Sequence, residues 1–320
     1  MSTLFLSKKD VRGLLTMTEV IEAVEQALKD LVGGKARMPA KAYLTLEKGD
    51  FRAMPVALSD SAGVKWICVY PENPSKGLPT VIGILIYNDP ETGYPLAVMD
   101  ATDITAYRTG ATAAIASKYL ARKDSHTLGI VGAGRQAYTQ LAAHAELFDI
   151  RLVKVYDRLD AAVEKFVKAF PQYQVKACSL EDTVASDILC TLTPARGPVV
   201  KSGWVKPGAH INAVGADAPW KEELDPYILK RAVLVVDDIE QANAAGEINV
   251  PVKNGFFKIE DVYATLGEIV SGKKRGRDDE KAITVFDSTG LAIEDIAVAR
   301  LIYEKARRKS GYLSLDFVEE

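Results

Sequence analysis

From residue 127 onward, short apolar runs of strand length alternate with segments whose apolar side chains recur at helical spacing. The run at 128–131 precedes a helical pattern at 138–148, and segments 160–169 and 226–231 are also helix-like. Further strand-like runs lie at 153–157, 174–178, 188–192, 210–215, 233–237 and 283–287. This alternation predicts the α/β class, with a doubly wound parallel sheet that has helices on both faces.

The preceding part of the chain follows a different pattern. Residues 7–33 repeat apolar side chains at helical spacing before a Gly-Gly pair, which predicts two helices. Short β-rich runs follow at 42–46, 51–58, 64–70, 80–87 and 95–100. Gly, Asp, Pro and Asn separate these runs, as in a mostly antiparallel sheet. Two further helices are predicted at 103–122, which is rich in small residues, and at 290–309, whose apolar face needs a partner.

The length and charge of the chain indicate how many domains it has and which partners it does not bind. With 320 residues, 48% of them hydrophobic and 26% charged, two soluble globular domains are the natural expectation. We place an α+β domain at residues 1–115 plus 295–320 and the doubly wound domain at 116–294. The net charge of -3 argues against binding to nucleic acid or to an anionic membrane surface.

Cysteine and histidine usage adds to this interpretation. The three cysteines have no Cys-x-x-Cys spacing, which is typical of a reducing compartment. No signal peptide and no apolar run of membrane-spanning length is visible, so we expect a cytoplasmic protein. His126, His144 and His210 are isolated, as expected for histidines at element ends or on helix surfaces. No acid or cysteine stands at ligand spacing to them, so no metal site is expected.

A glycine-rich turn follows the strand-like run at 128–131. Gly132 permits a tight turn, and Gly134, which lacks a Cβ, lets a diphosphate approach the backbone. Ala137 allows close packing of the following helix, whose N-terminal N–H groups face the negative charge. Asp157 ends the next strand about 20 residues further on, where a ribose-binding acid is expected. Strand, turn, helix and acid together predict dinucleotide binding.

Lys65 lies within an otherwise apolar strand-like run. Lysines are usually solvated, but alternation along a strand puts Lys65 on the same face as Ile67. An ammonium group there would be partly desolvated, and its pKa could fall into the range needed for acid/base chemistry.

Other charged residues occur where a ligand could bind. Arg52 and Arg108 have mostly apolar or small neighbours, and arginine binds carboxylates through a bidentate fork, although a simple salt bridge is the ordinary alternative. Asp217 follows a strand that ends in Gly215, on the side where ligands of doubly wound folds bind. Asp287 ends another strand, and we interpret it as a cap of the last helix.

The motifs around these residues resemble those of the ornithine cyclodeaminase/μ-crystallin family, and within it those of the archaeal NAD-dependent alanine dehydrogenases. The resemblance runs almost from end to end. It rests on F-R-A-M-P, G-V-K-W, G-L-P-T-V, P-L-A-V-M-D-A-T, R-T-G-A, G-A-G-R-Q-A, H-I-N-A-V-G-A-D, V-V-D-D-I-E-Q-A, G-E-I and F-D-S-T-G-L-A-I-E-D.

The resemblance implies a homodimer in which the first domain, completed by the last helix, binds substrate and the central domain binds NAD. Lys65 and Asp217 match catalytic residues, and Arg52, Lys65 and Arg108 are expected to bind the substrate. Cofactor contacts are expected from Arg108, Thr109, Gly132, Gly134, Arg135, Gln136, Asp157, Arg158, Thr193, Val214, Gly215, Asp217 and Ser288. Asp157 would repel a 2′-phosphate and favours NAD, whereas Arg158 leaves NADP possible.

Several activities fit this family. The first is NAD-dependent oxidative deamination of L-alanine to pyruvate and ammonia. Ornithine cyclodeamination to proline and imine or ketimine reduction are alternatives, and a nucleotide- or ligand-binding protein of the μ-crystallin kind is the non-enzymatic one. Arg52 stands where ornithine cyclodeaminases usually have a glutamate, and an arginine would repel the side-chain ammonium of ornithine.

Overall fold

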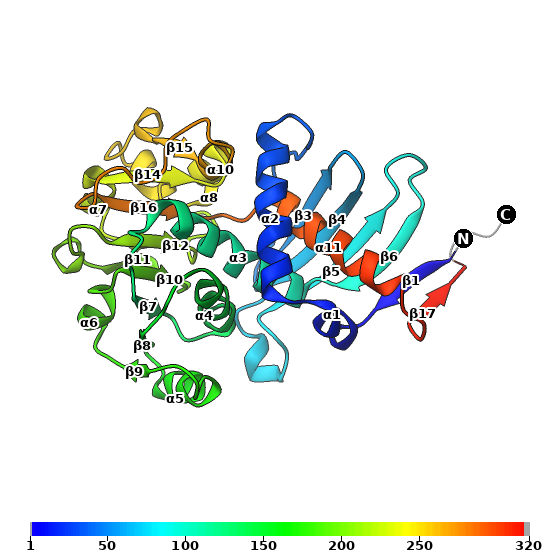
Figure 1. The fold of residues 1–320 in the computed structure, drawn as a ribbon, viewed down its shortest axis with the longest axis horizontal. Coiled ribbons are helices and arrows are strands. Elements are labelled where there is room, and N and C mark those ends of the chain that lie inside the picture. The colour runs from blue at the N-terminus through cyan, green and yellow to red at the C-terminus, as the bar shows by residue number, and fades with distance from the viewer. Residues whose placement is uncertain (1, 317–320) are drawn as a thin grey trace. The chain divides into compact units, whose positions relative to one another are not determined.

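The computed structural model describes residues 2–316, which divide into two compact units (Figure 1). The first unit comprises the described residues up to Arg108 together with those from Leu291 onward. The second comprises Thr109–Gly290. The division therefore falls at 108/109 and 290/291, whereas the sequence pattern placed it at 115/116 and 294/295. No helix of the described residues is both long and apolar enough to cross a membrane.

The first unit is built on a seven-stranded sheet with the order β17-β1-β6-β5-β4-β3-β2. Its β1–β6 pair is parallel and its other pairs are antiparallel. The strands are β1 (Thr3–Leu6), β2 (Ala42–Leu46), β3 (Gly49–Ala57), β4 (Ala62–Val69), β5 (Val81–Asn88), β6 (Pro95–Asp100) and β17 (Leu313–Leu315). The mostly antiparallel sheet expected from the sequence is present. The edge strand β17 and its neighbour β1 were not predicted.

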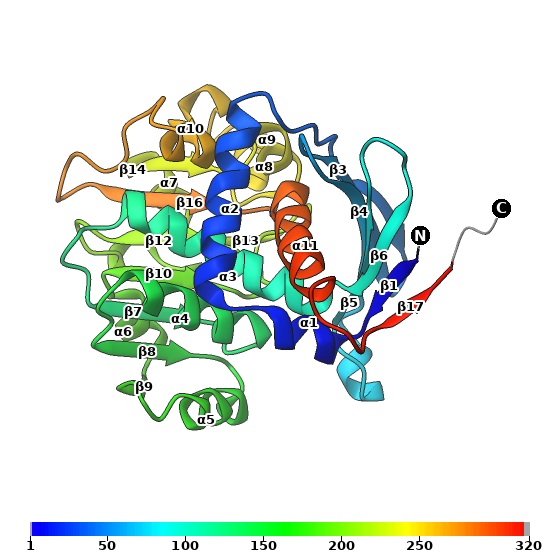
Figure 2. The same ribbon diagram turned by 45° about the vertical axis from the view of Figure 1, so that its right-hand side comes forward.

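Helices cover one face of this sheet. They are α1 (Lys8–Leu14), α2 (Met17–Val32) and α11 (Ala292–Ala306). A 3-10 turn, η1 (Asn73–Lys76), follows β4, and α3 (Thr102–Leu120) follows β6. Helix α11 packs against β3, β4 and β5, and α2 packs beside α11 (Figure 2). The covered inner face buries Met54, Ile67 and Leu85, whereas Trp66 and Ile84 on the outer face are 41% and 46% exposed. The inner face therefore forms the core of this unit, and the outer face is apolar but open.

The second unit contains an eight-stranded, entirely parallel sheet with the order β15-β14-β16-β12-β10-β7-β8-β9. The strands are β7 (Thr127–Val131), β8 (Leu152–Tyr156), β9 (Val175–Ala177), β10 (Ile188–Thr191), β12 (His210–Ala213), β14 (Ala232–Val236), β15 (Ala264–Thr265) and β16 (Ile283–Asp287). A small parallel pair, β11 (Arg196–Val200) and β13 (Glu222–Leu224), stands apart from this sheet and was not predicted.

Helices lie on both faces of the parallel sheet. They are α4 (Arg135–Leu147), α5 (Asp160–Ala169), α6 (Leu180–Val184), α7 (Pro226–Arg231), α8 (Ile239–Ala245), α9 (Asn249–Lys253) and α10 (Leu266–Val270), with short turns η2 (Ser202–Trp204) and η3 (Ile259–Asp261). One buried cluster joins α4 and α5 to the sheet, and another joins α6, α7 and α8 to it. The predicted doubly wound α/β class is confirmed, and the strand order reverses between β7 and β10.

His210 begins β12 and so lies at an element end as expected, whereas His144 of α4 is not on a helix surface. His144 and His210 are fully buried in the second unit. His144 Nε2 lies 2.9 Å from Ser117 Oγ, and His210 Nε2 lies 3.1 Å from Asn212 Oδ1. Burial lowers the pKa of His144 to about 4 and that of His210 to about 3. Both rings are therefore neutral structural hydrogen-bonding groups at physiological pH.

Candidate functional site

Lys65 is buried in the first unit, in the middle of β4. The antiparallel registers place it opposite Met54 of β3 and Leu85 of β5, on the inner face that α11 covers. Its side chain is only 1% exposed, and its Nζ forms an ion pair of 2.6 Å with Oδ2 of Asp295. The alternation of the strand thus buries the ammonium group, as the sequence suggested.

Two adjacent carboxylates in the first turn of α11 complete this group. Asp295 Oδ1 accepts a hydrogen bond of 3.1 Å from Arg108 Nε. Glu294 Oε2 accepts one of 2.8 Å from Arg108 Nη1. All four side chains are at most 8% exposed. We call Lys65, Arg108, Glu294 and Asp295 the lysine cluster.

Sequence reasoning missed Glu294 and Asp295, although both lie in the quoted motif F-D-S-T-G-L-A-I-E-D. The available signal was two consecutive acids in a helical segment that is otherwise apolar. Acids in a first turn normally interact with the helix dipole at the surface. Here their side chains are 0% and 1% exposed, which requires partners of opposite charge.

The pKa of Lys65 is lowered to about 7. Burial lowers the pKa most strongly because it removes water from the ammonium group. The negative charge of Asp295 raises the pKa in part, whereas the positive charges of Arg108 and Lys41 lower it. Lys65 can therefore take up and release a proton near neutral pH, as an acid/base group must.

Arg52 occupies the inner face of β3, two residues from Met54, and is 5% exposed. Its Nε donates a hydrogen bond of 2.6 Å to Asp50 Oδ1, and its guanidinium lies 5.4 Å from the ring centre of Tyr43. These contacts fix the orientation of the guanidinium group.

The glycine-rich turn of the second unit has the expected geometry. Gly132 has φ 103°, which side chains rarely adopt, and a Cβ on it would lie 3.1 Å from the backbone of Leu192. Gly134 precedes α4, and a Cβ on it would meet nothing within 4 Å. The N–H of Ala133 donates a hydrogen bond of 2.7 Å to Asp157 Oδ2. Asp157 thereby joins the turn after β7 to the end of β8.

Among the other candidate cofactor residues, Thr109 lies in α3 and Arg135 and Gln136 begin α4. Those that follow the carboxyl ends of parallel strands are Arg158, Thr193, Val214, Gly215, Asp217 and Ser288, and Glu223 connects two of these ends. Glu223 Oε1 accepts hydrogen bonds of 2.7 Å from both the N–H and the hydroxyl of Thr193, after β10. Glu223 Oε2 accepts from the Thr191 hydroxyl at 2.8 Å and from the N–H of Gly215, after β12, at 2.9 Å. Val214 is also held there, because its N–H donates to the Thr191 carbonyl. Sequence reasoning missed Glu223, since nothing local to it indicates that it reaches two loops.

Asp217 lies two residues beyond Gly215 in the same loop. Its Oδ1 accepts a hydrogen bond of 2.6 Å from Lys221 Nζ, and its side chain is 34% exposed. Trp220, in the same loop, has φ 66° and a side chain exposed to solvent. A left-handed backbone is uncommon for a bulky residue and marks this loop as locally strained.

The interpretation of Asp287 as a cap of the last helix is wrong. Helix α11 begins after Leu291, which makes no side-chain cap. The Asp287 carboxylate is fully buried and instead accepts hydrogen bonds from the N–H groups of Glu247 and Ile248, at 2.9 and 3.2 Å. Burial raises its pKa to about 8. Ser288, the next residue, is 4% exposed, and its N–H donates to the carbonyl of Ala213.

The second unit fits a dinucleotide. The N-terminus of α4 has no side-chain cap, so its N–H groups can bind phosphate oxygens. Gly134 leaves open space beside that terminus. The amide oxygen of Gln136 is buried without a hydrogen-bond partner among the described residues, and a nucleotide hydroxyl could donate to it. Residues 2–316 contain no group of His, Cys, Asp and Glu that could hold a metal ion.

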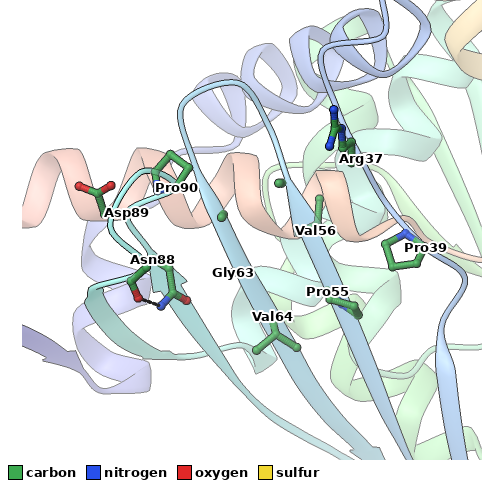
Figure 3. A pocket seen from close by; sticks show the side chains of 12 residues that line it. Arg37, Pro39, Pro55, Val56, Gly63, Val64, Asn88, Asp89 and Pro90 are labelled. Atoms are coloured by element: carbon green, nitrogen blue, oxygen red, sulfur yellow. Dashed lines mark hydrogen bonds between the residues drawn. The ribbon is translucent and has the colours of Figure 1, made fainter.

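A hollow of about 500 Å³ on the first unit contains none of these candidate residues (Figure 3). It is lined by the β3–β4 turn, by residues before β2 and by the turn after β5, including Arg37, Pro55, Val64 and Asn88. The Asn88 side-chain amide donates to the carbonyl of Gly93 in that turn. Because no buried acid, base or nucleophile lines this hollow, we assign it no role in catalysis.

The glycine turn, the acid after β8 and the reversal of strand order define a protein of the dinucleotide-binding (Rossmann) class. The model of the ornithine cyclodeaminase/mu-crystallin family matches residues 1–310. The chain therefore belongs to this family.

Similar proteins refine this picture. The chain is 53% identical to the alanine dehydrogenase of Archaeoglobus fulgidus over 312 residues, and the aligned part covers 97% of each protein. A solved archaeal alanine dehydrogenase dimer with bound NAD is 51% identical, with a TM-score of 0.97, over 99% of this chain and 100% of that one. The Δ(1)-pyrroline-2-carboxylate reductase of Thermococcus litoralis, solved with NADH and L-proline, is 43% identical, with a TM-score of 0.95, over 98% and 100%.

Proposed function

We propose that this protein is an NAD-dependent alanine dehydrogenase, which converts L-alanine, NAD and water reversibly into pyruvate, ammonia and NADH. The observation that carries the proposal is the buried Lys65, whose pKa near 7 suits proton transfer. The similarity to alanine dehydrogenases over almost the whole chain supports it. The same lysine argues against a purely nucleotide-binding protein, because burying an ammonium group is costly without a function.

Each candidate residue has a role in this proposal. Arg52 and Arg108 bind the carboxylate of the amino acid and orient its Cα. NAD held by the second unit would supply the acceptor for the hydride of Cα. Lys65 and Asp217 move protons as the amine becomes an imine, water adds to the imine carbon and ammonia leaves. The fixed charges of the lysine cluster stabilise the changing charge of the substrate.

The second unit supplies the nucleotide contacts. We propose that Gly132, Gly134, Arg135 and Gln136 surround the diphosphate and that Asp157 binds the ribose. The remaining contacts come from Arg108, Thr109, Arg158, Thr193, Val214, Gly215, Asp217 and Ser288. The carboxylate of Asp157 repels a 2′-phosphate, and we therefore propose NAD rather than NADP as the main cofactor.

Imine reduction is the second candidate function, because the Thermococcus litoralis reductase is 43% identical to this chain. Both reactions move a hydride between a nicotinamide and a carbon attached to nitrogen, so the same acid/base group would serve both. Ornithine cyclodeamination is less favoured, because the buried Arg52 guanidinium would repel the second ammonium group of ornithine.

A substrate panel separates these activities. Purified protein is mixed with L-alanine and NAD, with L-ornithine and a trace of NAD, or with Δ(1)-pyrroline-2-carboxylate and NADH. We expect L-alanine to give the highest kcat/KM, with equal amounts of NADH, pyruvate and ammonia. Higher kcat/KM for the cyclic imine would assign the protein as a reductase. Ammonia release from ornithine without net NADH would assign it as a cyclodeaminase.

We also propose that the protein is a cytoplasmic homodimer. The outer face of the first sheet leaves Leu44 of β2, Trp66 of β4 and Ile84 of β5 between 41% and 54% exposed, and exposed apolar patches usually bind another protein. A similar archaeal structure is a dimer. Sedimentation equilibrium should give twice the mass of one chain, and Trp66→Glu should reduce it to the mass of a monomer.

A further inference from the structure

We propose that Asp295 is a positioning residue that orients Lys65 and governs when Lys65 releases its proton. This inference rests on the proposed function, because it concerns the lysine assigned to acid/base chemistry. Asp295 is expected to act through Lys65 and not by contact with substrate.

The geometry gives each oxygen of Asp295 a separate cation. Oδ2 lies 2.6 Å from Lys65 Nζ, and Oδ1 lies 3.1 Å from Arg108 Nε. One carboxylate therefore holds the proposed acid/base group and a proposed substrate-binding group at a fixed separation. Because Asp295 is 1% exposed, water cannot screen either interaction strongly.

Charged groups reach Lys65 from several elements. Asp295 comes from α11, Arg108 from α3, and Lys41 from the residue before β2. Two of these three groups are cations that favour the neutral amine, and only Asp295 favours the ammonium form. Glu294 forms an ion pair with Arg108, the second cation of the cluster. Asp295 is therefore the carboxylate of this cluster that directly opposes the cations around Lys65.

The neighbouring residue provides a matched control. Glu294 is as deeply buried as Asp295, occupies the same helical turn and also binds Arg108, whereas the ion pair of 2.6 Å with Lys65 is made by Asp295. Replacing either acid by its amide removes one buried negative charge with little change of shape. Only the Asp295 replacement removes the ion pair with Lys65.

The test is the pH profile of kcat/KM for wild type, Asp295→Asn and Glu294→Gln. In Asp295→Asn, the limb governed by Lys65 should move to lower pH by about one unit or more, because the group that stabilised the ammonium is gone. In Glu294→Gln, KM should rise through Arg108 while this limb stays in place. An unmoved limb in Asp295→Asn, or an equal shift in both variants, would overturn the inference.

A second readout keeps the test independent of turnover. Trace acetylation of intact protein at a series of pH values, followed by mass spectrometry of the Lys65 peptide, reports the proton affinity of that amine. The wild-type labelling curve should bend near neutral pH, and the Asp295→Asn curve at lower pH. If wild type turns over no amino acid or imine, the proposed function fails, whereas the labelling curves still decide the role of Asp295.

If Asp295→Asn does not fold, Asp295→Glu is the alternative, since it keeps the charge but moves it by one methylene group. The labelling curve of that variant should shift less than about one pH unit while kcat falls, because the charge remains but Lys65 is displaced. A curve and a kcat that both match wild type would contradict a positioning role.

Discussion

The two units bury acidic side chains in opposite ways. In the first unit, Asp295 and Glu294 bind the cations of Lys65 and Arg108. In the second unit, Glu223 and Asp287 are held by backbone N–H groups and, for Glu223, also by threonine hydroxyls.

The same difference extends to two more acids of the second unit. Glu247 accepts from the N–H groups of Glu223 and Leu224, and Asp237 accepts from those of Thr289 and Gly290. We call Glu223, Asp237, Glu247 and Asp287 the acid cluster. It ties together loops at the carboxyl ends of the parallel strands, whereas the lysine cluster sets the proton affinity of one amine. In the proposed function, the acid cluster shapes the nucleotide loops and the lysine cluster prepares the acid/base group.

If the lysine cluster serves proton transfer, the largest loss of activity should come from replacing the proposed acid/base residues. Lys65→Met and Asp217→Asn should each lower kcat for L-alanine by about 100-fold to 10,000-fold, which is the usual contribution of a proton-transfer group. The Kd for NADH, measured by fluorescence titration, should stay within about twofold of wild type. A near-normal kcat in either variant would remove that residue from the mechanism.

The two clusters should also give opposite dependences of stability on pH. The pKa of Lys65 falls from 10.5 to about 7 on folding, so its contribution to the free energy of unfolding is full above pH 10.5 and is lost as the pH falls to 7. The pKa of Asp287 rises from 3.8 to about 8, so its contribution is full below pH 3.8 and is lost as the pH rises to 8.

Urea unfolding of wild type, Lys65→Met and Asp287→Asn at a series of pH values measures these contributions. Relative to Lys65→Met, wild type should gain stability from pH 7 to 10.5, and relative to Asp287→Asn it should lose stability from pH 4 to 8. Each difference should be on the order of a few kcal/mol. Parallel curves for wild type and either variant would show that the group titrates alike in the folded and unfolded chain.

Glu223→Gln should have a smaller effect, confined to the nucleotide loops. The amide offers one acceptor oxygen to the four donors of Thr191, Thr193 and Gly215, which should cost about 1–3 kcal/mol of stability. We expect NADH to bind about tenfold more weakly, as shown by calorimetric titration, while the pH profile of kcat stays in place. Unchanged NADH affinity would contradict the role of Glu223 in these loops.

Glu247→Gln is the control for Glu223→Gln, and we expect it to cause the smallest loss of stability in the acid cluster. Burial, and then the charge of Glu223, raise the pKa of Glu247 well above its usual value, so a neutral amide resembles its protonated form. The variant should lose less than about 1 kcal/mol of stability in urea unfolding and should bind NADH normally. A loss as large as that of Glu223→Gln would show that the two acids are equivalent.

The sequence predicted the local features of both units but not the contacts between distant residues. Hydrophobic periodicity was enough for the parallel sheet and the burial of Lys65, and the spacing of glycines was enough for the turn, because each depends on residues within one strand or one turn. It could not pair Lys65 with Asp295, because these residues are distant in sequence and α11 must first pack on the sheet.

Long-range hydrogen bonds explain why the expectations for Asp287 and the histidines differ from the structure. Asp287 resembled a helix cap because a helix follows it, but the donors it binds lie about 40 residues earlier in the chain. His144 and His210 looked isolated because Ser117, the partner of His144, and Thr284, a partner of His210, are distant from them in sequence. Buried polar groups find such partners only in the assembled fold.

The most direct test of the account uses L-alanine deuterated at Cα, with NAD and the purified protein. The account predicts that deuterium appears in the reduced nicotinamide, that pyruvate and ammonia form in equal amount, and that Lys65→Met loses this transfer while still binding NADH. Deuterium that stays with the amino acid, or nucleotide that is recovered oxidised after ammonia has been released, would contradict it.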